Sequence, residues 1–240
     1  MASTATEFDS DCVLMLHCDG ADTSTTFTDS SFSNTKTVTA NGNAQIDTAQ
    51  SKFGGASGLF DGTGDYLSIA DDADWYLGTG DFTIDCWLRF PSNPDVLEMG
   101  ILSQTVDDNN RIYLRQSGTT IDFAAVSGGT TLIAMNRSFN FEVDTWYHFA
   151  FVRTGNDFLM FIDGTQIGLT LTDTSEWPDI AAALNIGVRG TAADFMNGWM
   201  DEIRIVKGTA VWTANFTPPT AAYVEKTASE FDSSFVFEFS

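Results

Sequence analysis

Carboxylates that could hold a divalent cation occur in a short glycine-rich stretch. Asp61 and Asp65 are separated by Gly62-Thr63-Gly64, so this loop can turn tightly and bring both carboxylates toward one point. Asp19 and Asp201, which stand at the ends of two predicted strands, are further candidates. Calcium takes about six to eight oxygen ligands. The pattern predicts either part of a structural Ca²⁺ site or a turn whose aspartates bind their own backbone.

Aromatic side chains in predicted loops could bind a sugar. Trp75 and Tyr76 follow an acidic run, and Trp177 precedes Pro178. A pyranose has an apolar face and a hydroxyl rim, so its site combines an aromatic platform with polar and carboxylate groups. Trp75, Tyr76 and Trp177 are therefore predicted ligand-binding residues, the alternative being that each folds onto the edge of the domain. Trp87 could line a sheet face. The remaining tryptophans are predicted core or staple residues: Trp146, Trp199 and Trp212.

These side chains need a scaffold, and the sequence predicts one made of β-strands. Apolar and polar residues alternate over short runs between turn signals, most clearly from Phe82 to Phe90. The run from Trp146 to Val152 is apolar on both alternations apart from His148, which predicts a strand buried on both faces. Residues 127–130 and 163–164 are predicted hairpin turns. Short helical turns are predicted near 71–77 and 179–184.

Many short strands with frequent turns predict an all-β fold, an antiparallel two-sheet jelly-roll sandwich. Its predicted extent is residues 11–217, between an N-terminal extension (1–10) and a C-terminal extension (218–240) that carries a repeat-like strand. The three cysteines, Cys12, Cys18 and Cys86, are predicted buried, reduced thiols because an odd, small number makes no disulfide framework.

The charge of the chain limits its partners. The 240 residues include 33 acidic and 11 basic side chains, a formal net charge of −22. Nucleic acid and anionic membranes both need clustered cations, so neither is a predicted partner. No apolar run approaches about 18 residues, so no membrane insertion is predicted. The N-terminus lacks a basic start followed by an apolar segment, so no secretory signal is predicted.

One motif occurs at both ends of the chain. Residues 4–10 and 227–233 share six of seven residues at an offset of 223, and the apolar runs 12–16 and 235–239 follow them. Two interpretations compete with a fortuitous edge strand. The chain is one unit of a tandem array, or residues 227–240 pair with the sheet of a neighbouring copy. Either of these two predicts homo-oligomers or contacts with other proteins of a particle.

Five stretches in a fixed order resemble the laminin-G-like, concanavalin A-like jelly-roll family. They are 14–20 (LMLHCDG), 53–67, 81–87, 146–164 and 197–205. The resemblance implies the same two-sheet fold, in which structural calcium ligands stand at strand ends. The stretch from Lys207 to Pro219 is similar to the version found in tailed-bacteriophage virion and tail-fibre proteins.

The same broad fold occurs in glycoside hydrolases, which need two carboxylates about 5–5.5 Å or about 6.5–9.5 Å apart. The Glu-x-Asp-x-x-Glu motif of laminarinase-like members does not occur here, nor does any nucleophile elbow, Walker loop or HExxH motif. Asp201 and Glu202 are adjacent on a predicted strand and so point to opposite faces. His17 and His148 are predicted core or edge histidines. No catalytic residue and no enzymatic activity are predicted.

The predicted function is a non-enzymatic virion surface protein, a decoration or fibre subunit that displays an adhesion module. Its predicted partners are copies of itself, other virion proteins and a cell-surface glycan, with assembly in the host cytoplasm. The alternatives are a lectin-like receptor binder outside a virion and a sandwich glycoside hydrolase.

Overall fold

The protein is an all-β sandwich, as the alternating pattern predicts. The computed structural model describes residues 7–32, 35–92, 98–190 and 194–225. Apart from one 3-10 turn, η1 (Ala73–Trp75), the regular elements of these ranges are β-strands. Within the same ranges no helix is long and apolar enough to cross a membrane.

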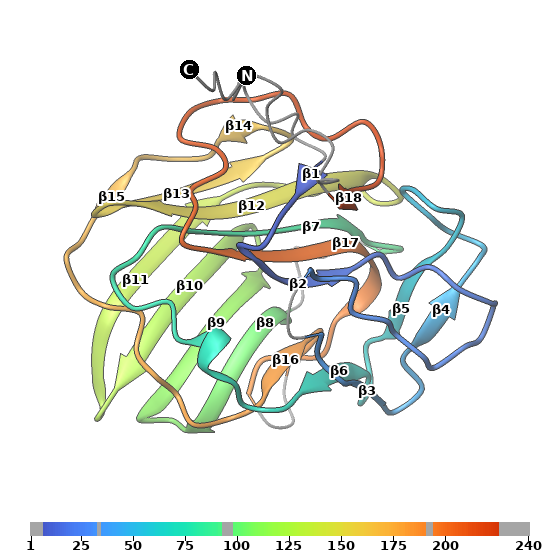
Figure 1. Ribbon diagram of the computed structural model, residues 1–240, viewed down its shortest axis with the longest axis horizontal. Coiled ribbons are helices and arrows are strands. Elements are labelled where there is room, and N and C mark those ends of the chain that lie inside the picture. The colour runs from blue at the N-terminus through green and yellow to red at the C-terminus, as the bar shows by residue number, and fades with distance from the viewer. Residues whose placement is uncertain (1–6, 33–34, 93–97, 191–193, 226–240) are drawn as a thin grey trace, which may run out of the picture.

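One sheet has seven antiparallel strands in the order β11-β10-β9-β8-β16-β6-β3 (Figure 1). Their bounds are β3 (Val38–Asn41), β6 (Tyr66–Ile69), β8 (Glu98–Asp107), β9 (Asn110–Ser117), β10 (Thr120–Ser127), β11 (Thr130–Ser138) and β16 (Leu184–Ile186).

The other sheet has nine antiparallel strands in the order β14-β13-β12-β7-β17-β5-β4, where β15 also pairs with β13 and β2 with β17. Their bounds are β2 (Cys12–Leu16), β4 (Gln45–Asp47), β5 (Ser57–Asp61), β7 (Phe82–Arg89), β12 (Trp146–Thr154), β13 (Asp157–Ile162), β14 (Thr165–Gln166), β15 (Leu171–Thr172) and β17 (Asn197–Lys207).

The core lies between the inner faces of the two sheets. On β7 the inner alternation is the predicted one, with Phe82, Ile84, Cys86 and Leu88 all buried in the core. Phe151 and Phe123, from opposite sheets, approach with ring centroids 4.6 Å apart. Burying a side chain of this size contributes roughly 1.5–3 kcal/mol, so the inner faces supply much of the stability. Cys12, Cys18 and Cys86 are buried free thiols, as predicted.

The predicted hairpin turns are confirmed by their backbone angles. Asp163 and Gly164 have φ values of 48° and 71°, and Gly128 and Gly129 have values of 57° and 77°. Both turns therefore use the positive φ that a two-residue hairpin requires. The predicted helical turn at 71–77 is present as η1, whereas the one at 179–184 is wrong. There Ile180 and Leu184 are buried in the core, and this packing overrides the helix propensity of the alanines.

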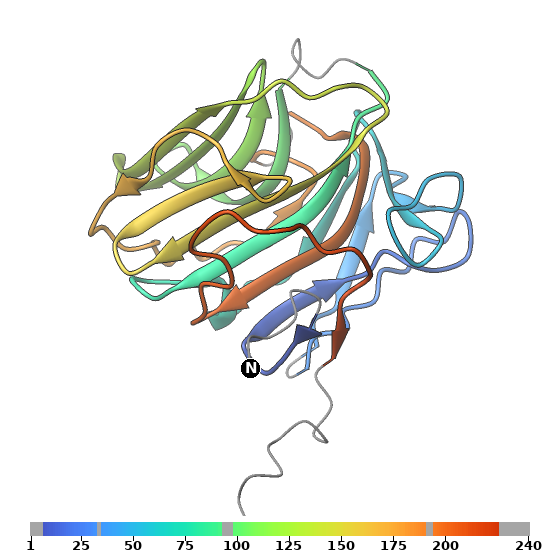
Figure 2. The same cartoon turned by 90° about the horizontal axis from the view of Figure 1, so that it is seen from above.

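The chain does not leave the domain at Pro218, where the predicted C-terminal extension begins. We define the C-terminal strap as residues 208–225, which runs across the outer face of the nine-stranded sheet (Figure 2). Trp212 and Phe216 stack with ring centroids 4.1 Å apart, and both rings lie perpendicular to the His148 ring. The strap then ends in β18 (Val224–Glu225), which pairs in parallel with β1 (Glu7–Phe8). The repeat at 227–239 lies outside the described residues.

The strap also covers a buried polar network. Asp85 Oδ1 accepts a hydrogen bond from Arg204 Nε at 2.9 Å, and Asp85 Oδ2 accepts one from the Tyr223 hydroxyl. His148, fully buried as predicted for a core histidine, lies with Nε2 3.4 Å from the same carboxylate. Burial alone would raise the pKa of Asp85, but Arg204, His148 and Tyr223 outweigh it and lower the pKa. The network therefore holds an ionised carboxylate inside the protein.

Candidate functional site

Beyond the strap, the outer face of the nine-stranded sheet presents a row of large side chains. Trp146 on β12 is paired in register with Arg89 on β7, and Arg89 with Trp199 on β17. The row continues through Leu59 on β5 to Gln45 on β4. All five residues are partly exposed. We call Trp146, Arg89 and Trp199 the tryptophan row.

Exposure separates these two tryptophans from the rest. All six tryptophans of the chain fall within the described ranges, and four of them are buried. The buried ones, with their exposed fractions, are Trp75 (3%), Trp87 (3%), Trp177 (2%) and Trp212 (6%). Only Trp146 and Trp199 are partly exposed among the six, and they flank the same arginine.

Hydrogen bonds fix the geometry of the row. The Arg89 guanidinium lies 5.2 Å from the centre of the Trp199 ring, and its Nη1 donates to Asp144 Oδ1 at 2.6 Å. The Trp199 indole Nε1 donates to Asp47 Oδ2 at 2.7 Å. Each partner limits the rotamers of the side chain that it binds, so Arg89 and Trp199 are organised before any ligand arrives.

A loop packs on the outer face of the sheet next to the row. Asp201 Oδ2 accepts hydrogen bonds from the backbone N–H groups of Lys52 and Phe53, at 2.7 and 3.1 Å. The Phe53 ring then meets Trp87 edge-on at 5.8 Å, and Lys52 Nζ lies 3.8 Å from the centre of the Trp87 ring. Trp87 thus lies on the outer face, as its alternation predicts, but it is covered by this loop.

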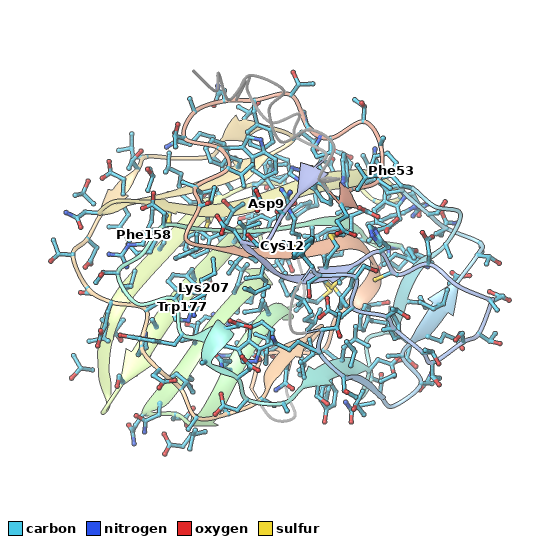
Figure 3. The ribbon with its side chains drawn as sticks, in the orientation of Figure 1. Asp9, Cys12, Phe53, Phe158, Trp177 and Lys207 are labelled. Atoms are coloured by element: carbon cyan, nitrogen blue, oxygen red, sulfur yellow. The ribbon has the colours of Figure 1, made fainter. Side chains whose placement is uncertain are left out.

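Two of the three predicted sugar-binding aromatics are core residues. Trp177 stacks on Phe123 at 5.1 Å and meets Phe82 edge-on at 5.3 Å. Trp75 is also buried, and its indole donates to the Ala70 carbonyl at 2.9 Å. A buried ring has no face to offer a sugar, so the prediction that Trp75 and Trp177 form an exposed platform is wrong. Figure 3 labels Trp177 inside the sandwich, well apart from Phe53 at the upper right.

Tyr76, the third predicted aromatic, is 39% exposed. Its hydroxyl donates to Glu176 Oε2 at 3.0 Å. Because the adjacent Trp75 and the nearby Trp177 turn into the core, Tyr76 is not part of an aromatic cluster of the predicted kind.

The predicted calcium loop folds as a hydrogen-bonded turn. Asp65 Oδ2 accepts from the Asp61 N–H at 3.0 Å, and Asp65 Oδ1 accepts from the Asn43 N–H at 2.7 Å. Asp61 Oδ1 accepts from the Thr63 N–H at 2.7 Å, and its Oδ2 from Asn43 Nδ2. All four carboxylate oxygens of Asp61 and Asp65 therefore accept a hydrogen bond. This agrees with the alternative that the sequence predicts a turn.

Asp19 and Asp201 contact a different segment, the loop that contains Lys52 and Phe53. The Asp19 carboxylate lies against Gly54, where a Cβ would come within 2.0 Å of it. Burial raises the pKa of Asp201 to about 8, despite the hydrogen bonds from Lys52 and Phe53. Glu202 is engaged separately, by His17 Nδ1 at 2.7 Å and the Tyr223 N–H at 2.7 Å.

The four aspartates therefore form two separate pairs. Across the part of the chain that the structure describes, no three His, Cys, Asp or Glu side chains group as metal ligands. The residues do not fit the single calcium site that the loop spacing suggests. Calcium binding stays a prediction.

Sequence reasoning missed the tryptophan row. Trp146 and Trp199 occur in apolar strands, which predicts core or staple residues rather than a ligand-binding surface. The signal that could have found Trp146 is its alternation with His148, Ala150 and Val152, which places it on the outer face. Nothing in the sequence shows that the strap stops short of this end of the sheet.

Comparison with known proteins identifies the family. A family model for the concanavalin A-like lectin/glucanases superfamily matches residues 61–212. The chain belongs to this superfamily. No curated protein sequence is recognisably similar to it.

Solved structures share the concanavalin A-like fold at low identity. The binding domain of botulinum neurotoxin serotype G is 12% identical, with a TM-score of 0.63 over 83% of this chain and 49% of that one. The binding domain of botulinum neurotoxin DC, in complex with rat synaptotagmin II, is 13% identical, with a TM-score of 0.61 over 84% of this chain and 49% of that one. This chain therefore spans about half of the toxin binding domains.

A smaller domain matches over nearly its full length. Domain 4 of AbnA, an extracellular GH43 arabinanase from Geobacillus stearothermophilus, was solved in complex with arabinotriose. It is 16% identical, with a TM-score of 0.62 over 83% of this chain and 93% of that one. At this identity the likeness concerns the fold.

Proposed function

We propose that this concanavalin A-like domain is a non-enzymatic adhesion module that binds carbohydrate at the tryptophan row. The observation that carries the proposal is that the two partly exposed tryptophans lie in one cross-strand row on either side of Arg89. An indole face matches the apolar face of a pyranose. The similar domain solved with arabinotriose supports carbohydrate as the ligand class.

The polar groups beside the row suit a hydroxyl rim. The Arg89 guanidinium offers N–H donors, Gln45 offers an amide, and the carboxylates of Asp144 and Asp47 can accept from sugar hydroxyls. Asp144 and Asp47 are each bound to a member of the row, Arg89 and Trp199. These bonds favour binding over acid–base chemistry, which supports the non-enzymatic proposal.

The proposed setting is the surface of a virion, assembled in the host cytoplasm. The support is the resemblance of residues 207–219 to tailed-phage virion and tail-fibre proteins, together with the repeated terminal motif. In this proposal residues 227–240 contact a second copy or another virion protein. Deleting residues 227–240 should then prevent assembly without unfolding the domain, and unchanged assembly would contradict this part.

A glycan array tests the binding proposal. We expect the wild type to bind at least one glycan, and Trp199→Ala and Trp146→Ala each to weaken binding by about tenfold or more. Tyr76→Ala is the matched control, because Tyr76 is exposed and lies outside the row. Loss of binding in the control alone, or no glycan binding by the wild type, would overturn the proposal.

A further inference from the structure

The Lys52 ammonium differs from every other basic group that the structure describes. Ten lysines and arginines lie within the described ranges. Nine of them donate to an oxygen acceptor: Lys36, Arg89, Arg111, Arg115, Arg137, Arg153, Arg189, Arg204 and Lys207. The Lys52 ammonium has only ring contacts among these residues, with Trp87 and Phe53. In a chain with three times as many acidic as basic residues, an unpaired ammonium is unexpected.

The environment of Lys52 holds the ammonium in place while removing part of its hydration. Its backbone N–H is bound by Asp201, and its Nζ lies 3.8 Å from the centre of the Trp87 ring. Partial burial lowers the pKa of Lys52, although Asp163 and Asp201 act in the opposite direction. A partly desolvated cation with three donors gains most from an acceptor that carries a negative charge.

Lys52 lies next to the tryptophan row. Trp87 and Arg89 are two residues apart on the outer face of β7, which corresponds to about 6.6 Å along a strand. Asp201, which binds the backbone of Lys52, is paired in register with Trp87 and lies two residues from Trp199 on β17. The ammonium is therefore at the border of the row, within the span of one or two sugar rings.

We propose that Lys52 makes the row selective for sugars that carry a carboxylate, such as uronic or sialic acids. This inference rests on the proposed function, because the sugar ring must stack on the row for its carboxylate to reach Lys52. The net charge of −22 repels anions at long range, but salt screens this repulsion over about 8 Å at physiological ionic strength. Selectivity must therefore come from a cation in contact with the ligand. The Arg89 guanidinium is already paired with Asp144, whereas the Lys52 ammonium has no carboxylate bound to it among the described residues.

Calorimetry on the full chain tests the inference with matched ligand pairs. The probes are tetragalacturonate against its methyl ester, and 3′-sialyllactose against lactose. We expect the wild type to bind the acidic member of at least one pair about tenfold more tightly than the neutral member. Lys52→Gln should reduce that ratio to about twofold without weakening the neutral member. Lys207→Gln, which removes a lysine elsewhere, should preserve the ratio.

The outcomes separate this inference from the proposed function. Equal affinity for both members of each pair, or an unchanged ratio in Lys52→Gln, overturns the role of Lys52. If neutral binding is still lost in Trp199→Ala, the proposed function stands while the inference fails. If the wild type binds no glycan in the array or in calorimetry, both fail.

Discussion

The outer face of the nine-stranded sheet has two halves that use the same three strands, β7, β12 and β17. Under the strap, these strands contribute Asp85, His148 and Arg204, all buried. Beyond the strap, four, two and five residues away along these strands, lie Arg89, Trp146 and Trp199, all partly exposed. The side chains of both halves point the same way from the sheet. The two halves differ because the strap covers the first and not the second.

The comparison shows that similar side chains take different roles depending on whether the strap buries them. Each half contains an arginine bound to an aspartate and aromatic rings beside it. The covered pair, Arg204 and Asp85, is desolvated, and the fold depends on both partners being present. The pair outside the strap, Arg89 and Asp144, includes a carboxylate that is 63% exposed and remains accessible to a ligand. The following predictions test this difference, from the largest expected effect to the smallest.

Breaking the covered ion pair should have the largest effect. Asp85→Asn leaves the Arg204 guanidinium buried without a counter-charge, so we expect the free energy of unfolding to fall by about 3–5 kcal/mol. The matched control is Asp144→Asn in the exposed pair, for which we expect about 1 kcal/mol or less. Urea denaturation at pH 7 measures both. Similar losses in the two variants would contradict the comparison.

Trp212 and Trp199 should separate stability from binding. Trp212→Ala removes a buried ring from the strap, so the expected loss of unfolding free energy is about 3 kcal/mol, with glycan affinity retained in the folded fraction. Trp199→Ala should cost about 1 kcal/mol or less but weaken binding about tenfold or more. Thermal melting and calorimetry on both variants provide the readouts. A reversed pattern would show that the strap, rather than the uncovered row, holds the binding site.

Acid should destabilise the covered half through Asp85. Because Arg204, His148 and Tyr223 lower its pKa in the folded state, Asp85 stabilises the fold above the ordinary value of 3.8. That contribution is lost as pH falls from 3.8 through the lower pKa of the folded state. Unfolding free energies measured from pH 5 to 2.5 should therefore fall more steeply for the wild type than for Asp85→Asn. Parallel pH profiles would argue against an ionised Asp85.

Calcium should have the smallest effect, because the carboxylates of Asp61 and Asp65 already accept hydrogen bonds. A site saturated at 100 times its Kd would add about 2.7 kcal/mol, enough to raise the melting temperature by roughly 5–10 °C. We expect a difference below about 1 °C between millimolar calcium and chelator. A rise of several degrees would instead support the calcium prediction from the sequence.

The fold was predictable from local patterns. The alternation of Phe82, Ile84, Cys86 and Leu88 places a core face on β7, and the glycines of two hairpins mark turns that need positive φ. These signals depend only on residues close together in the sequence, so they can be recognised without knowing any tertiary contact.

The site was not predictable, because it depends on which surfaces other segments cover. Trp177 follows a polar, loop-like stretch, yet its ring fills the space between Phe82 and Phe123. Trp146 begins an apolar strand, yet it is partly exposed. Exposure of a ring is decided by contacts between residues far apart in sequence, which periodicity does not encode.

The most direct test of the account observes the six indole N–H signals by NMR during titration with a glycan that the wild type binds. The tryptophan row predicts that the signals of Trp146 and Trp199 shift in proportion to the bound fraction, while those of Trp75, Trp177 and Trp212 stay in place. Unmoved signals for Trp146 and Trp199 at saturation would contradict the central claim that the uncovered row is the carbohydrate-binding surface.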